Sequence, residues 1–173
     1  MRKLTLVAGA LALAFAAVAE KAAAPIAPSQ GDGDARKHLA DFFLRTKGTS
    51  RVVSASEVWD DLRAGKTKYR VVDVRPVDEY EKGHVPGAIN IPLDVLFRPA
   101  SLEMLPANGQ PILLVCQSGH MESMALGGLA ALGYEPYVLR FGMIGWNAET
   151  KVKVAGVPRQ QDVVHGLGAP LEK

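Results

Sequence analysis

The residue with the clearest chemical potential is Cys116, the only cysteine of the 173-residue chain. It follows the apolar run Pro-Ile-Leu-Leu-Val at 111–115 and precedes the segment Gln-Ser-Gly-His at 117–120, after which a helical pattern begins. A short loop between a strand and a helix directs successive backbone N–H groups to one point, and the helix N-terminus adds partial positive charge. Such surroundings stabilise a thiolate and make it nucleophilic at neutral pH. The alternative is a buried cysteine that ends a strand and has no chemical role.

The pattern of apolar residues predicts the elements that position this loop. Strands are expected at 69–74, 88–91, 111–116 and 135–139, and the third of these is apolar on both faces and therefore central. Helices are expected at 34–47, 54–65, 76–82 and 119–132, with brief helical turns within 93–105. The second helix begins with a capping box formed by Ser54 and Glu57. Strands that alternate with helices predict one α/β domain whose central parallel sheet has helices on both faces.

Several segments of the chain resemble the rhodanese family of sulfurtransferases. They are Val-Val-Asp-Val-Arg at 71–75, Glu-Tyr at 79–80, Gly-His-Val-Pro-Gly-Ala-Ile-Asn-Ile-Pro at 83–92, the Cys116 loop, and Gly-Met-Ile-Gly-Trp at 142–146. The resemblance covers about residues 51–147 and implies a single parallel-sheet domain whose cysteine carries a persulfide between a sulfur donor and a nucleophilic acceptor. It implies that Cys116 is the sulfur carrier. By the same resemblance, the cradle around the outer sulfur is formed by Gln117, Ser118, Gly119, His120 and Met121.

The loop departs from the common family pattern Cys-x-x-Gly-x-Arg at one position. Met121 stands five places after the cysteine, where a basic residue is usual, and Glu122 follows it. The change removes the cation expected to attract a dianion such as thiosulfate, and a carboxylate near the thiol opposes the lowering of its pKa. The Gly119-His120 pair is similar to a branch of exported single-domain rhodanese-like proteins. Persulfide chemistry at Cys116 is the leading expectation, and a non-catalytic rhodanese-like binding module is the alternative.

Three polar residues outside the loop are expected to support the site. Asp73 and Arg75 match the family motif after the 69–74 strand. We expect them to form an ion-pair network in which Arg75 reaches Glu79 and Asp73 accepts loop N–H groups. His84 is expected to be a hydrogen-bonded structural histidine. For His120 two interpretations stay open, a positive charge near the thiolate or an exposed side chain without a role.

Residue spacing and charge argue against several other functions. The four histidines show no ligand spacing with Cys116, so neither a metal nor another cofactor is expected. A phosphatase or arsenate reductase needs a longer loop closed by an arginine, and thioredoxin-like exchange needs a Cys-x-x-Cys motif. Without Arg2 and Lys3 the chain has 18 basic and 18 acidic residues, so nucleic acid is not an expected partner. The expected partners are a small sulfur donor and a thiol or cyanide acceptor, including a protein thiol.

The first nineteen residues have the pattern of a secretory signal peptide. Arg2 and Lys3 precede an apolar run at 4–19 that closes on Ala-Val-Ala, the small residues that a signal peptidase recognises. The run is shorter than the roughly twenty residues that span a bilayer, so we expect a periplasmic or otherwise secreted protein with no membrane span after cleavage. The rest of the chain divides into a flexible leader at 20–33, a rhodanese-like domain with an N-terminal helix at 34–147, and a C-terminal tail at 148–173.

The mature protein is expected to begin near Glu20, because all parts of a signal peptide precede it. Mass analysis of the N-terminus of the native protein measures this cleavage. Recovery of the full-length chain from membranes would show instead that the apolar run is an uncleaved anchor.

Overall fold

A computed structural model of the chain describes residues 33–47, 50–147 and 166–173. The expected signal peptide at 1–19, nearly all of the expected leader at 20–33 and most of the expected tail lie outside the described residues. Across the ranges that are described, no helix has both the length and the apolar character needed to cross a membrane.

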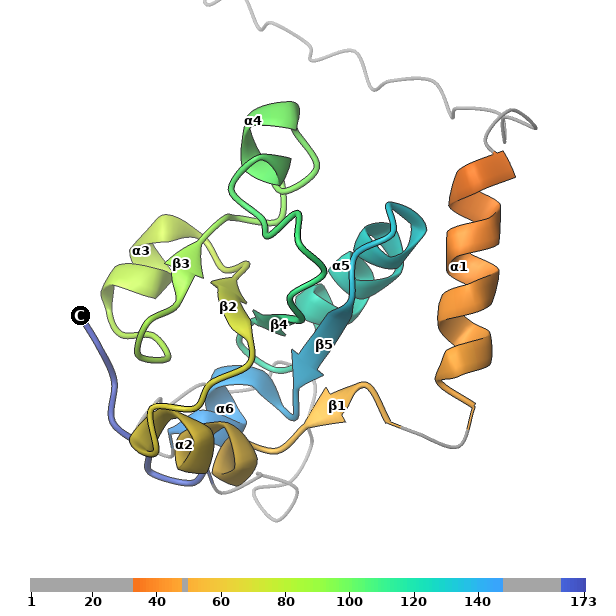
Figure 1. Ribbon diagram of the computed structural model, residues 1–173. Coiled ribbons are helices and arrows are strands. Elements are labelled where there is room, and N and C mark those ends of the chain that lie inside the picture. The colour runs from red at the N-terminus through yellow and green to blue at the C-terminus, as the bar shows by residue number, and fades with distance from the viewer. Residues whose placement is uncertain (1–32, 48–49, 148–165) are drawn as a thin grey trace, which may run out of the picture. The chain divides into compact units, whose positions relative to one another are not determined.

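The centre of the fold is a five-stranded sheet in which every pair of neighbouring strands is parallel (Figure 1). The strand order is β1-β5-β4-β2-β3, so β4 is central and β1 and β3 are the edges. The bounds are β1 Val52–Val53, β2 Arg70–Asp73, β3 Ile89–Asn90, β4 Ile112–Val115 and β5 Pro136–Leu139. All four residues of β4 are buried, as its continuous apolar sequence predicts for a central parallel strand.

Six helices occur in the described part of the chain, and they cover both faces of the sheet. Their bounds are α1 Gly33–Arg45, α2 Ala55–Arg63, α3 Val77–Glu81, α4 Pro99–Leu102, α5 His120–Ala131 and α6 Gly142–Trp146. The parallel α/β architecture predicted from the sequence is therefore confirmed.

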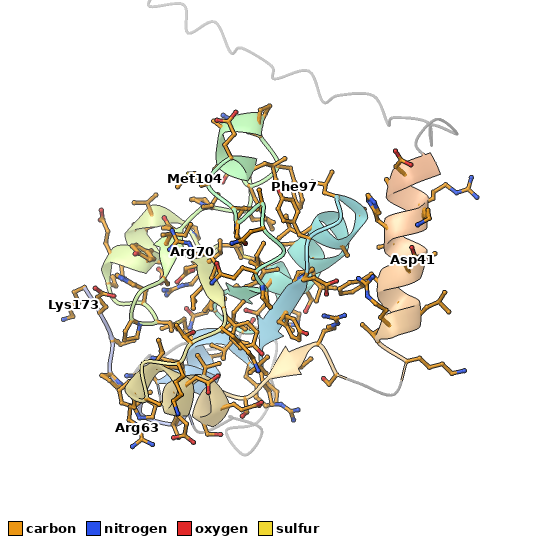
Figure 2. All side chains as sticks on the ribbon, viewed as in Figure 1. Asp41, Arg63, Arg70, Phe97, Met104 and Lys173 are labelled. Atoms are coloured by element: carbon orange, nitrogen blue, oxygen red, sulfur yellow. The ribbon has the colours of Figure 1, made fainter. Side chains whose placement is uncertain are left out.

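The hydrophobic core has two halves because successive strand residues face opposite sides of the sheet. Leu113 of β4 lies in the half that also holds buried residues of α2 and α6. Leu114 lies in the half covered by α5, against which α1 packs. The segment between β3 and β4 covers this second half too, and its Phe97 ring lies against Gly128 of α5 (Figure 2).

The four predicted strands and the predicted helices are present, most of them with shorter ends, and two elements were not predicted. Ser54 caps α2, since its Oγ accepts the Glu57 N–H at 3.2 Å, as the capping pattern indicates. The edge strand β1 has only two residues, too few for a periodic pattern to show. The five-residue helix α6 contains two glycines, which disfavour helix in sequence terms, and tertiary contacts decide its conformation.

The last eight residues run along the domain and bind it at several points. The backbone of Glu172 forms an antiparallel bridge with His84. The Trp146 indole N–H donates to the Pro170 carbonyl at 2.9 Å, and the Asn147 side-chain amide donates to the Ala169 carbonyl at 2.7 Å. Residues 166–173 are therefore part of the folded domain.

Candidate active site

Cys116 lies directly after the carboxyl end of β4, where parallel α/β sheets place their functional loops. Helix α6 fixes the loop from one side, because the Met143 N–H donates to the Cys116 carbonyl at 2.8 Å and the Ile144 N–H donates to the Gln117 carbonyl at 3.1 Å. The backbones approach so closely that a Cβ at Gly142 would lie 2.2 Å from the Cys116 carbonyl oxygen. The loop therefore requires glycine at position 142. This requirement gives a structural reason for the first glycine of the Gly-Met-Ile-Gly-Trp motif.

Backbone N–H groups of the loop converge on the Cys116 sulfur. The Gly119 N–H donates to Sγ at 3.2 Å, and the backbones of Ser118 and Glu122 also act to lower the pKa of this thiol. Gly119 has φ +103°, a conformation that side-chain-bearing residues rarely adopt, and it turns the chain into α5. The loop geometry inferred from the sequence is thus present, with the amides aimed at one atom.

Glu122, in the first turn of α5, is fully buried beneath this loop. Its Oε2 accepts the Cys116 N–H at 2.6 Å. Among the residues that the structure describes, two buried side-chain polar atoms have no hydrogen-bond partner, and they are Glu122 Oε1 and Gln117 Nε2. A carboxyl group with one paired and one unpaired oxygen therefore lies next to the candidate nucleophile.

The electrostatics of the resting site differ from the sequence-based expectation. Cys116 is only 1% exposed, and burial raises the pKa of its thiol. The charge of Glu122 raises the same pKa further, against the lowering effect of the backbone N–H groups of Glu122, Ser118 and Gly119. The prediction that the thiol pKa is lowered is therefore wrong. Burial and the charge of Glu122 raise this pKa by more than the three backbone N–H groups lower it.

Burial also changes the state of Glu122 itself. It raises the pKa of this carboxyl from 4.5 to about 8, and the charge of Asp73 contributes to the rise. Hydrogen bonds with the backbone and the side chain of Cys116 act in the opposite direction. At neutral pH the carboxyl is therefore mainly protonated, which makes the site less negative than the sequence indicates.

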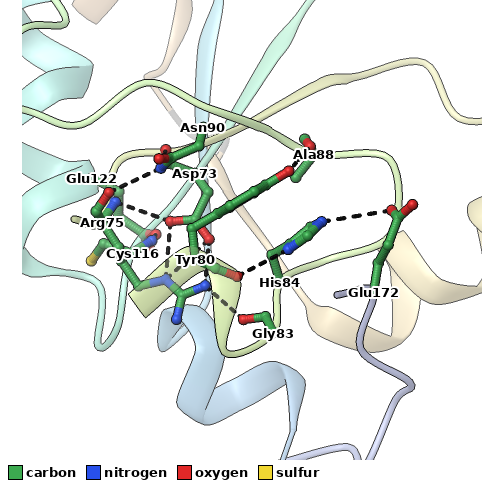
Figure 3. Close-up of polar contacts among 10 residues, drawn as sticks. All are labelled: Asp73, Arg75, Tyr80, Gly83, His84, Ala88, Asn90, Cys116, Glu122 and Glu172. Atoms are coloured by element: carbon green, nitrogen blue, oxygen red, sulfur yellow. Dashed lines mark hydrogen bonds and ion pairs between the residues drawn. The ribbon is translucent and has the colours of Figure 1, made fainter. Parts of the chain in front are cut away.

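Asp73 and Arg75 lie at the end of the neighbouring strand β2 and form a buried ion pair (Figure 3). The shortest contact joins Arg75 Nη2 to Asp73 Oδ2 at 2.6 Å, and the same nitrogen donates to the Gly83 carbonyl at 2.9 Å. Asp73 also accepts the Arg75 backbone N–H, as expected. The expected contact between Arg75 and Glu79 is wrong, since Glu79 pairs with Lys82 and Arg75 turns inward to the strand end.

His84 makes structural contacts that hold it away from the Cys116 loop. Its Nδ1 lies 3.0 Å from the Tyr80 carbonyl, and its ring stacks on the Tyr80 ring with the centroids 3.7 Å apart. Its Nε2 lies 3.8 Å from Glu172 of the terminal segment. Figure 3 shows His84 between Tyr80 and Glu172, on the far side of Arg75 from Cys116. The structure therefore links His84 to the chain end.

The other loop side chains divide between solvent and core. His120 is exposed, and its Nδ1 lies 2.9 Å from the Ser118 hydroxyl oxygen. Met121 packs against the core half beneath α5. In the described ranges no group of three or more His, Cys, Asp or Glu side chains is placed to hold a metal ion.

The burial of Glu122 is the feature that sequence reasoning missed. An acidic residue in the first turn of a helix usually faces solvent and interacts with the helix dipole. A signal was nevertheless present, because Glu122 precedes the buried Ala125 and Leu129 by three and seven residues and so lies on their face of α5.

Replacing Glu122 by glutamine is expected to change how stability depends on pH. Because the folded-state pKa of Glu122 is raised from 4.5 to about 8, the folded protein keeps a proton that the unfolded chain has released. The contribution to the free energy of unfolding is therefore complete below about pH 4.5 and is lost as pH rises toward about 8. The amide cannot ionise, so the variant should lack this loss.

Urea unfolding across this pH range measures the effect. Glu103→Gln removes the same charge from an exposed position and should retain the wild-type pH dependence. If the free energies of unfolding of the wild type and of Glu122→Gln changed in parallel with pH, this result would contradict a buried, neutral carboxyl group at Glu122.

Comparison with known proteins agrees with this architecture. The family described as "Rhodanese-like domain" matches residues 54–149. The chain is 30% identical over 131 residues to a putative sulfur carrier protein, YrkF, of Bacillus subtilis, a match that covers 71% of this chain and 67% of that protein. It is also 32% identical over 81 residues to the adenylyltransferase and sulfurtransferase UBA4 of Candida albicans, covering 44% of this chain and 18% of that one.

Among solved structures, a rhodanese-like domain protein from Staphylococcus aureus superimposes with a TM-score of 0.51 at 26% identity, over 59% of this chain and 97% of that chain. The family match spans more than half of the chain and contains β2, β4, the cysteine loop and α6. With the parallel sheet and the amide-lined loop at its carboxyl edge, the chain belongs to the rhodanese-like domain family.

Proposed function

We propose that this protein is an exported sulfurtransferase or persulfide carrier in which Cys116 accepts a sulfane sulfur and passes it to a nucleophile. The observation that carries the proposal is the 3.2 Å hydrogen bond from the Gly119 N–H to the Cys116 sulfur. The backbones of Ser118 and Glu122 also act to lower the pKa of the same thiol. A ring of fixed N–H donors stabilises negative charge on sulfur without needing to reorganise during the reaction.

The chemistry that suits this loop is a pair of displacements at divalent sulfur. In the first, the Cys116 thiolate attacks the outer sulfur of a persulfide R–S–SH. The Sγ–S bond forms, the donor S–S bond breaks, and its electron pair leaves on the donor thiolate. In the second, a thiolate or cyanide attacks the outer sulfur, and the Sγ–S electron pair returns to Cys116. No electron carrier is needed, and the backbone N–H groups hold the negative charge of each sulfur anion in turn.

The charges around the loop favour a weakly charged donor. The Arg75 guanidinium near this sheet edge is occupied by Asp73 and the Gly83 carbonyl. The position expected to supply a cation holds Met121, which packs into the core. A dianion such as thiosulfate therefore meets amides without a counter-ion, whereas a persulfide brings at most one negative charge. The donor class that fits is a persulfide or polysulfide.

Similarity supports the transfer chemistry, and the N-terminal sequence supports the location. The Bacillus subtilis relative has the printed description of a putative sulfur carrier, which is the role that the loop geometry suits. The basic residues Arg2 and Lys3 and the apolar run at 4–19 favour export to the periplasm or an equivalent space. The acceptor would then be a small thiol, cyanide or the thiol of an exported protein.

A second candidate function is a rhodanese-like module that binds a partner without catalysis. The observation that favours it is the burial of Cys116 together with the raised pKa of its thiol. Both features make the resting thiol less reactive than a free cysteine at neutral pH. The two candidates differ in one measurable property, which is whether sulfur becomes covalently attached to Cys116.

Exposure to a persulfide or polysulfide donor is expected to add sulfur to the protein in single-atom steps, as intact-mass analysis would show. Because Cys116 is the only cysteine, Cys116→Ser is the matched control and should gain no mass. A thiol acceptor added afterwards should return the wild-type protein to its original mass. Wild-type protein that gains no sulfur from any donor would favour the binding module.

Met121→Arg is expected to increase sulfur loading from thiosulfate by about ten- to a hundredfold. A charge-assisted contact contributes about 1.5–3 kcal/mol, which corresponds to that factor at low donor concentration. Met124→Arg adds the same charge at an exposed position of α5 and should have little effect. The initial rate of sulfite release from thiosulfate measures both variants. If a normally folded Met121→Arg variant gave no increase, the missing cation would not be what limits this donor.

A further inference from the structure

The carboxyl group of Glu122 interacts with both the backbone and the side chain of Cys116. Glu122 Oε2 accepts the Cys116 backbone N–H at 2.6 Å, and the carboxyl group also interacts with the cysteine side chain. Both residues are closed off from solvent. The second oxygen, Oε1, is buried without a partner and lies under the loop, 3.7 Å from where a Cβ at Gly119 would stand.

Three elements pack around this pair, and two of them carry charged or titratable groups. On β2, Asp73 faces Glu122 and is itself paired with Arg75 (Figure 3). On α5, the exposed His120 is hydrogen-bonded to Ser118. Helix α6, which binds the loop from the other side, has no titratable residue. Within the described residues, no hydrogen bond or ion pair joins Glu122 to a cation. The negative charge of its carboxyl group is therefore removed only when that group is itself protonated.

We propose that Glu122 is a positioning residue whose titration is coupled to that of Cys116, so that the protonation of its free carboxyl oxygen decides whether the sulfur can carry negative charge. With a proton on Oε1, the carboxyl group is neutral and the loop amides hold a single sulfur anion. Without that proton, a carboxylate lies beside the sulfur in a buried site and disfavours a second negative charge there.

For sulfur transfer, this inference rests on the function proposed above. The net loading step is Cys116–SH + R–S–SH → Cys116–S–SH + R–SH. The thiol proton leaves to solvent and the departing donor thiolate takes one from solvent, while Glu122 keeps its own proton throughout. The protonated carboxyl group thus adds no negative charge beside the sulfur, although no cation is supplied at position 121, and its ionisation sets an upper pH limit to efficient loading.

Glu122→Gln separates this role from a purely structural one, because the amide oxygen can still accept the Cys116 N–H while the side chain stays neutral at every pH. The thiolate fraction of Cys116, followed by its ultraviolet absorbance with Cys116→Ser as the blank, should be similar in wild type and variant while Glu122 is protonated. Above about pH 8, where Glu122 ionises, the variant should hold about tenfold more thiolate, and its midpoint should be lower by about one pH unit or more.

Glu103→Gln, which removes a charge from an exposed position, should titrate like the wild type. Identical profiles for wild type and Glu122→Gln would overturn the proposal, and so would a higher thiolate midpoint in Glu122→Gln. Because the titration needs no sulfur donor, its result is independent of the transfer assay. A protein that shows the coupled titration but accepts no sulfur keeps the coupled Glu122–Cys116 pair and loses only the sulfurtransferase assignment.

A second measurement needs no change at Glu122 and therefore holds if that variant fails to fold. Carbon NMR of protein labelled at the glutamate carboxyl groups should show one signal with a midpoint near 8. The same signal should show a further inflection as the thiol ionises, and this inflection should disappear in Cys116→Ser. A Glu122 midpoint near the ordinary value of about 4.3 would overturn the proposal.

Discussion

A single hydrogen bond joins the central strand to the helix that follows it. The Glu122 carboxyl group accepts the first N–H after β4, at 2.6 Å, and so fixes the start of α5 directly beneath the strand end. The chain between these two points has to curl, and Gly119 supplies the required conformation. Two N–H groups of α6 hold the outer side of the same loop. The sulfur consequently lies among amides, but in a space with little access to water.

This arrangement gives the loop an unusual balance of charge. A family loop with an arginine would hold sulfur anions by attraction, whereas here Met121 stands at that position and the guanidinium of Arg75 is bound to Asp73. Amide dipoles and one protonatable acid are left to regulate the charge on the sulfur. Fixed dipoles discriminate less strongly between neutral and singly charged ligands than a full positive charge does. The donor class proposed above, a small and weakly charged sulfur compound, follows from this balance.

The sequence predicted the features whose signals are local and strong. Apolar runs such as 111–115 indicated the buried strands, Ser54 and Glu57 indicated a helix start, and the family motifs located the cysteine loop. The strand β1 was missed because pairing with β5 creates it, and no two-residue pattern can show that. The sign of the thiol pKa shift was also missed, because it depends on how deeply Cys116 and Glu122 are buried. The helical spacing of Glu122 indicates which face of α5 it shares, but how deeply both residues are buried results from the packing of α5 and α6.

The terminal segment has a consequence for the order of events during synthesis. Glu172 bridges to His84, which lies 88 positions earlier, and the Trp146 indole finds its acceptor only at Pro170. Contacts so distant in sequence cannot form while the last residues are still inside the ribosome. This part of the domain therefore closes only once residues 166–173 have left the ribosome.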